Sequence, residues 1–390
     1  MKNKIIKAAA VISMSLLLTG CWDSIEIDRK AFIDTIAIDI GNDIDKKPVN
    51  SNPEEEENTL KDLNIVRVTY NFPDIRNMDK DKGTTEKLSL SVDGYSLSDA
   101  YIKAISKASR NFHFGHSKLL MVSDEVYGYP ALVTEFVDYI QRTPSINRSM
   151  MMVIVEGKTT DFLAAEPLLE DGVDSYITNL LANGREYGSI KPVTVTRYID
   201  KADSGELAII PLFTLKDKND IELTGAAVIK DNRIKEKLSN EDMDNICMLN
   251  GSIGSSKKMI ISDNHPIDYY IKDVESDMDV KLEQDKLKLT YNISAEGDLS
   301  GFYSEGGTLE DSDIKNIEQE FDRKIEEDLL STINSLVKEK NLDVIEVKNK
   351  IIKYHPSIAR QIGDDWDRYI GESEIVVNVQ SRIRTVGISN

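Results

Sequence analysis

The stretch DIKNIEQEFDRKIEEDLLSTINSLVKEK, residues 313–340, is the longest periodic segment of the chain. Its apolar residues recur every three or four positions, whereas Lys and Glu occupy the opposite side. This spacing predicts an amphipathic helix that spans roughly 40 Å at about 1.5 Å per residue. The spacing drifts toward a four-residue step and sustains no heptad, which favours packing on a sheet over a coiled coil. The apolar positions are Ile314, Ile317, Phe321, Ile325, Leu329, Ile333, Leu336 and Val337.

Short strands are predicted on both sides of this helix, because β-branched and aromatic residues alternate there with polar ones. The strands before it are 258–262, 269–272, 279–283 and 286–294; a short helix at 357–366 and a closing strand at 374–384 follow it. We therefore predict a C-terminal α/β domain over residues 255–390, with the long helix 313–340 packed on an antiparallel or mixed sheet.

The N-terminal part alternates predicted strands and helices, which is typical of a mixed α/β domain. The strands are 32–40, 63–72, 88–92, 118–122 and 150–155; the helices are 96–110, 130–142, 159–165 and 175–187. Ser96 or Ser98 is suited to cap the first of these helices. We assign this domain to residues 21–200. Residues 42–62 are polar and include the acidic run Glu54–Glu57, which predicts a solvated loop within it.

A small middle domain is predicted for residues 201–254. Three short strands, at 207–215, 223–230 and 233–238, precede a helix at 240–249. Asp231-Asn232 suits a tight turn between the last two strands, and Ser239 suits the N-cap of the helix. The overall prediction is an α/β (α+β) chain of three domains.

Charge and cysteine content exclude several classes of protein. The 390 residues carry a formal net charge of −20, which argues against binding to nucleic acid and against broad adsorption to anionic lipid. The chain has two cysteines, Cys21 and Cys247. Cys247 lies in a mixed apolar stretch, and we interpret it as a small buried hydrophobic residue.

The first 20 residues have the features of a signal peptide. Three lysines precede the apolar run Ala8–Leu18, whose 11 residues are too few to span a bilayer as a helix. The run ends in Leu18-Thr19-Gly20-Cys21, which resembles a bacterial lipobox. We expect cleavage before Cys21 and attachment of a diacylglycerol to its sulfur. Two acyl chains would hold the protein on the outer, extracytoplasmic face of a membrane.

Possible catalytic and metal-binding groups are sparse. His113 and His116 have a spacing that could bind a metal, but no acidic residue or cysteine stands beside them. Gly115-His116-Ser117 is half of a nucleophile elbow, without the final glycine. Asp277 with Asp279, and the acids at 364, 365 and 367, lack the spacing of a calcium loop. We therefore predict no catalytic residue, no metal site and no cofactor besides the acyl group on Cys21.

The order of several short motifs resembles that of one family, the Ger(x)C lipoproteins of endospore-forming bacteria. The resemblance covers nearly the whole chain, and no single motif carries it alone. One departure is that similar proteins often have a glycine soon after the position of Asp343, where this chain has Ile345-Glu346-Val347. The motifs are Gly20-Cys21-Trp22-Asp23, Phe114-Gly115-His116-Ser117-Lys118-Leu119-Leu120, Leu223-Thr224-Gly225-Ala226-Ala227-Val228, Asn341-Leu342-Asp343-Val344, Tyr354-His355-Pro356 and Trp366.

The resemblance implies a membrane-tethered C subunit of a nutrient germinant receptor. Its partners would be a large A subunit and a multi-pass B subunit in the spore inner membrane, and it would act in spore germination without being an enzyme. The alternative is a lipoprotein that itself captures a small nutrient. Such a protein usually has two similar lobes around a cleft, whereas the predicted domains here are unequal. We expect the contact surfaces near the junctions 201–206 and 251–256.

Overall fold

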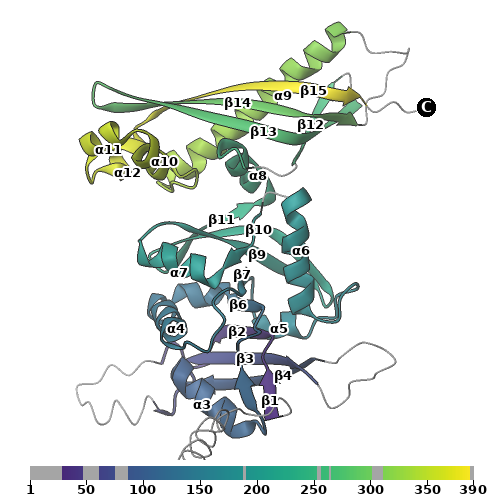
Figure 1. The fold of residues 1–390 in the computed structure, drawn as a ribbon, viewed down its shortest axis with the longest axis vertical. Coiled ribbons are helices and arrows are strands. Elements are labelled where there is room, and N and C mark those ends of the chain that lie inside the picture. The colour runs from purple at the N-terminus through teal and green to yellow at the C-terminus, as the bar shows by residue number, and fades with distance from the viewer. Residues whose placement is uncertain are drawn as a thin grey trace, which may run out of the picture.

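The computed structural model describes residues 29–46, 61–74, 87–187, 190–252, 256–262, 265–300 and 311–386. The signal peptide, Cys21 and most of the predicted loop 42–62 lie outside these residues. The described chain is elongated, with its N-terminal elements at one end and a separate sheet carrying the C-terminal helices at the other (Figure 1).

Nine strands of the described chain form one sheet, in which the order is β11-β10-β9-β7-β6-β2-β3-β4 and β8 pairs with β7. The central pairs β2–β6, β6–β7 and β7–β9 are parallel, whereas the outer pairs are antiparallel. Their bounds are β2 (Thr35–Ile40), β3 (Val66–Pro73), β4 (Lys87–Gly94), β6 (Leu119–Ser123), β7 (Met151–Val155), β8 (Val193–Thr194), β9 (Ala208–Asp217), β10 (Asp220–Lys230) and β11 (Arg233–Ser239).

Both faces of this sheet are buried. Successive side chains of a strand point to opposite faces, so Leu119 and Met121 of β6 join one apolar cluster, and Leu120 and Val122 join the other. Helices cover the two faces, as parallel strands require. They are α3 (Leu97–Lys107), α4 (Pro130–Arg142) and α7 (Val195–Asp203) on one face, and α5 (Thr159–Leu163), α6 (Val173–Tyr187) and α8 (Asn240–Leu249) on the other.

Two further strands and a 3₁₀ turn complete the N-terminal part. β1 (Lys30–Phe32) pairs in parallel with β5 (Asn111–His113) at the end of the molecule where α3 lies (Figure 1). The turn η3 (Asp124–Gly128) leads into α4. The predicted caps are confirmed, because the Ser96 and Ser239 side chains accept backbone N–H groups of α3 and α8. Asp231 and Asn232 both have positive φ, which fits the predicted tight turn.

The C-terminal sheet has the order β12-β13-β14-β15 and is mixed, because β14 and β15 are parallel while the other pairs are antiparallel. The strands are β12 (Ser256–Ser262), β13 (His265–Glu283), β14 (Lys286–Ser300) and β15 (Glu374–Val386). The helix α9 (Asp311–Thr332) lies along this sheet (Figure 1). Its side chains at 317, 321, 325 and 329 are buried, which confirms the predicted stripe and its four-residue step.

Three predictions in this region need correction. Strands 269–272 and 279–283 are parts of one strand, β13, whose polar residues between them lie on the exposed side. The long helix is α-helical to Thr332 and continues as a π-helical segment, η4 (Ile333–Glu339). The helix at 357–366 is two helices, α11 (Pro356–Ile362) and α12 (Trp366–Gly371), separated at Gly363, whose φ is +62°. A helix α10 (Val347–Tyr354) precedes them and was not predicted.

The predicted division at 200/201 stays a prediction; one element runs across it, and one strand pairs across it. Helix α7 includes residues 200 and 201, and β9 adds to the sheet by pairing with β7. The middle segment also contacts the C-terminal part through buried polar groups. Asn245 of α8 donates to the Thr332 hydroxyl at 2.9 Å, and the ammonium group of Lys258 donates to Asn245 at 2.8 Å and pairs with Asp328 at 3.1 Å.

Candidate functional site

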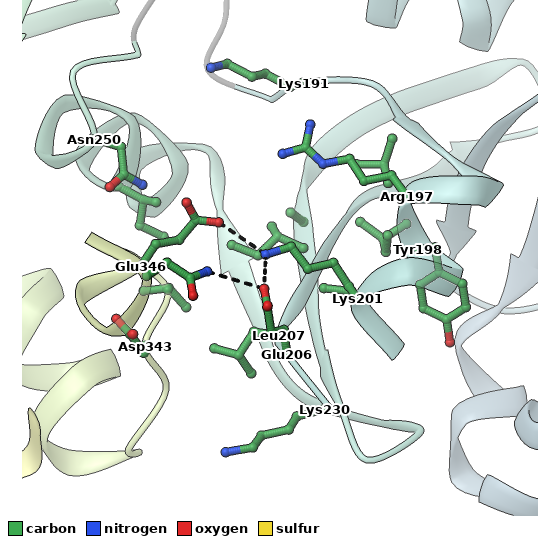
Figure 2. A pocket seen from close by; sticks show the side chains of 18 of the residues that line it. Lys191, Arg197, Tyr198, Lys201, Glu206, Leu207, Lys230, Asn250, Asp343 and Glu346 are labelled. Atoms are coloured by element: carbon green, nitrogen blue, oxygen red, sulfur yellow. Dashed lines mark hydrogen bonds and ion pairs between the residues drawn. The ribbon is translucent and has the colours of Figure 1, made fainter. Parts of the chain in front are cut away.

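A cavity of about 410 Å³ lies where the middle segment meets the C-terminal part. Its walls come from α7, the beginning of β9, α8, residues 341–349 and α12. Lys191 and Arg197 project from one side and Lys230 from another, and Asn250, Asp343 and Glu346 line the opposite wall (Figure 2). The volume is in the range of small-molecule sites. The cavity includes residues 204–206 and 252, so a groove does lie beside the two predicted junctions.

Lys201 is at the centre of this cavity and bridges two parts of the chain. Its ammonium group is 2.5 Å from a Glu206 carboxylate oxygen and 3.4 Å from one of Glu346, and the Asn349 amide also donates to Glu206 (Figure 2). Burial by itself lowers the pKa of Lys201, but the hydrogen bonds and charges of the two glutamates outweigh it and raise that pKa. The hydrogen bond from Lys201 lowers the pKa of Glu206. Both groups are therefore charged at neutral pH.

The Asp343 carboxylate caps the first turn of α10 at the edge of the cavity. It accepts the backbone N–H groups of Val347 at 2.7 Å and Lys348 at 2.9 Å, which are free donors in the first turn of α10. Burial raises the pKa of Asp343 despite these hydrogen bonds. Lys350 is half-buried nearby and donates to the Leu249 carbonyl at 3.1 Å, and its partial burial lowers its pKa. These groups fix α10 against the middle segment.

The residue before α10 has a backbone conformation that disfavours a side chain. Glu346 has φ 56° and ψ 37°, in the left-handed region. Glu346 lies within Ile345-Glu346-Val347, the stretch in which similar proteins often have a glycine. An L-residue in this region costs roughly 1–2 kcal/mol, and glycine does not incur this cost. The ion pair with Lys201 offsets little of it, because half of the Glu346 side chain is exposed.

We expect Glu346→Gly to be more stable than Glu346→Ala by about 1 kcal/mol, the reverse of the usual order for helical positions. Both variants remove the ion pair with Lys201, so the comparison isolates the backbone. Thermal unfolding of residues 22–390 measures the difference. An alanine variant as stable as the glycine variant would show that position 346 is not left-handed.

The other groups singled out in the sequence have structural partners. The Ser117 hydroxyl is buried and donates to the Ile33 carbonyl at 2.8 Å. The rings of His113 and His116 are 5.5 Å apart and both pack near Phe32. Burial and the nearby charge of Lys30 lower the pKa of His113. Cys247 is buried, as predicted, and it lines the cavity.

Within the described ranges, no group of three or more His, Cys, Asp or Glu side chains is placed to hold a metal ion. The sequence pointed to the junctions 201–206 and 251–256 but not to the wall formed by residues 341–349 and α12, because these residues are far from the junctions in the chain. One signal was present: Asp343 stands four residues before Val347, and Val347 and Ile351 have helical spacing. Together these features indicate a capped helix at this wall.

Comparisons with known proteins place this multidomain α/β chain in a family. The family model described as "Spore germination protein N-terminal domain" matches residues 23–215, and the one described as "Spore germination B3/ GerAC like, C-terminal" matches residues 224–387. The two matches together cover most of the chain. The chain therefore belongs to the Ger(x)C family of spore germination proteins, as its motifs predicted.

Curated relatives match over nearly their full length. "Spore germination protein A3" of Bacillus subtilis (strain 168) is 25% identical, with 98% of each chain covered. "Putative spore germination protein YfkR" of the same organism is 21% identical and covers 97% of this chain and 95% of its own. The solved structure titled "Crystal Structure of the GerBC protein" has a TM-score of 0.59 at 16% identity, covering 82% of this chain and 93% of that one. This last similarity shows the shared fold.

Proposed function

We propose that this protein is a non-enzymatic, lipid-anchored subunit of a spore germinant receptor. It would act in nutrient-triggered germination on the outer face of the spore inner membrane, beside the A and B subunits. The observation that carries the proposal is the match of both family models in order along one chain. Two relatives named as spore germination proteins also align over 98% and 95% of their own lengths.

The non-enzymatic role is supported by what the polar groups do. Lys201 pairs with both Glu206 and Glu346. Asp343 caps α10, and the Ser117 hydroxyl donates to a backbone carbonyl. A catalytic nucleophile needs a base within hydrogen-bond reach and a place for substrate, and these groups are already engaged with the fold. Their arrangement holds the middle and C-terminal parts together.

Cys21→Ala is expected to abolish lipidation and to leave precursor or released protein. The acyl group is the proposed attachment, and no described helix is long and apolar enough to cross a membrane. Metabolic labelling with a fatty-acid analogue, followed by fractionation of membranes, measures the effect. Cys247→Ala is the matched control and should retain both the label and the membrane fraction. Label persisting on the Cys21 variant would contradict the proposal.

Pull-down of the tethered protein from spore membranes tests the receptor role. We expect the A and B subunits to be recovered with the wild-type protein at native abundance, and nutrient-triggered germination to fail when the gene is deleted. Recovery of an ATP-driven permease in their place would instead indicate a solute-capture system.

The alternative, direct capture of a small nutrient, has one observation in its favour. The cavity beside Lys201 has a suitable volume and presents both cationic and anionic side chains. Calorimetry of the protein against amino acids, sugars and nucleosides separates the two proposals. We expect no tight binding; a dissociation constant of about micromolar or below, roughly −8 kcal/mol, would favour the alternative.

A further inference from the structure

The charges of this acidic protein are unevenly distributed along the chain. Residues 100–123 contain no Asp or Glu, although the whole chain has 68 acids. The same stretch contains Lys103, Lys107, Arg110 and Lys118, as well as His113 and His116. It comprises most of α3, then β5 and the beginning of β6. Lys103 and Lys118 pair with Asp99 and Asp174, which lie outside the stretch, so Lys107 and Arg110 are its uncompensated cations among the described residues.

This cationic stretch lies beside the point at which the described chain begins. β1 pairs with β5 so that Lys30 is opposite Asn111, next to Arg110. Tyr101 of α3 contacts Phe112 of β5 with ring centroids 6.5 Å apart, which joins the helix to the two strands. Figure 1 shows α3 and β1 together at the end of the molecule opposite the C-terminal sheet.

The outer side of α3 is also unusually apolar for an exposed surface. Ile102 is 61% exposed and Ile105 is 40% exposed, whereas Leu97, Ala100 and Ala104 of the same helix are buried. On α3, Ile102 and Ile105 lie on one flank and Lys107 on the other, since successive residues are turned by about 100°. We use the term basal face for the exposed or half-exposed residues of α3, β1 and the segments that flank β5, which are Lys30, Ile102, Ile105, Lys107, Arg110 and His116. Among the described residues, Lys30, Lys107 and Arg110 form no ion pair, so these charges are available to a partner.

We propose that the basal face lies on an anionic lipid bilayer and sets the orientation of the protein on the membrane. The proposal rests on the lipid anchor of the proposed function. Eight residues, 22–29, separate Cys21 from Lys30, and the nine Cα-to-Cα steps of an extended chain reach roughly 30 Å. The acyl group therefore keeps the face within a short distance of the headgroups. The linker 22–28 adds three acids, so the cationic contact has to come from the face.

The cationic and apolar side chains of the basal face are suited to contact with an anionic bilayer. Lys and Arg near an anionic surface are attracted over about a Debye length, and isoleucines that project from a helix can enter the headgroup region. The rest of the acidic protein is repelled by the same surface, which favours one orientation. The cavity and the C-terminal sheet would then stand away from the bilayer, where the soluble part of another subunit can contact them.

A lipid-quenching experiment on the full lipidated protein tests the proposal. Cys247→Ala serves as background, and an environment-sensitive dye is attached at Ile102→Cys or, as the matched control, at Ile352→Cys on α10, where Ile352 is 48% exposed. Each protein is reconstituted on vesicles of phosphatidylcholine with or without phosphatidylglycerol, containing a spin-labelled lipid. We expect quenching at position 102 several times that at position 352 on the anionic vesicles, and a decrease with added salt.

Charge reversal provides the second measurement. Lys107→Glu with Arg110→Glu should remove most of the quenching at position 102, while Lys315→Glu with Lys338→Glu in the C-terminal part should not. Both pairs change the net charge equally. Protein that floats with the vesicles but is not quenched at position 102 would overturn the orientation and leave the anchor intact. Equal quenching on neutral vesicles would overturn the role of charge, and protein that does not float at all would overturn the anchor and the orientation together.

Discussion

Leu329→Asp is expected to cost at least about 4 kcal/mol of folding free energy and to abolish cooperative unfolding of the C-terminal part. Leu329 is completely buried, in the middle of the stripe that α9 packs on the C-terminal sheet. The substitution removes the transfer free energy of a leucine and places a carboxyl group among apolar side chains. An unpaired buried carboxylate costs several kcal/mol or is protonated with a raised pKa, so the variant should be less unstable at acid pH than at neutral pH.

Lys338→Ala is the control for this prediction, because Lys338 lies in η4 on the polar side of the same helical segment. We expect a change within about 0.5 kcal/mol. Thermal and denaturant unfolding of residues 22–390 measure both variants. Equal shifts of the midpoint for the two would show that the stripe does not face the sheet.

Elements that depend on local pattern were predictable from the sequence. The predicted helix 130–142 coincides with α4, because a proline at its first position and a run of inward apolar residues define both its start and its face. The caps at Ser96 and Ser239 follow from a serine that precedes an apolar-periodic segment. Asp231-Asn232 is a turn because short polar side chains tolerate positive φ.

Features that depend on distant pairing were not predictable in the same way. The sequence indicates that β9 is a strand but not that it pairs with β7, because pairing partners are chosen by the packing of both faces. Residues 269–272 and 279–283 were predicted as separate strands, yet in the structure the charged residues between them occupy the exposed side of one strand, β13. The helix α10 begins at the left-handed Glu346 and takes its cap from Asp343, which is an unusual start.

The ion pairs of the cavity were not predictable for the same reason, because one of them joins residues that are distant in the chain. Lys201, Glu206 and Glu346 form its ion pairs, yet Glu346 is separated from the other two by about 140 residues of chain. Only the docking of α10 on the middle segment brings them together. The basal face is different, since a run without acids is visible in the sequence alone. Its exposure and its position beside β1 required the structure.

Gly225→Ala is expected to be as damaging as the substitution in α9, with a loss of about 4 kcal/mol or more. Gly225 is in β10 at a shift of register between β9 and β10, and its φ is +152°, which side chains rarely adopt. A Cβ there would be 1.8 Å from the Leu238 carbonyl oxygen in β11. Because that atom belongs to the backbone, no rotamer change relieves the clash, and β11 has to move away from β10.

The matched control is Gly128→Ala at the end of η3, where a Cβ meets no atom within 4 Å. This change should be within about 0.5 kcal/mol of wild type, or slightly stabilising because it restricts the unfolded chain. Thermal unfolding compares the two, and hydrogen exchange locates the damage. Loss of protection in β10, β11 and α8 is expected first, because α8 follows β11 directly. Since α8 also lines the cavity, the variant should loosen the joint between the middle and C-terminal parts; unchanged protection there would contradict the close approach of β10 and β11 at Gly225.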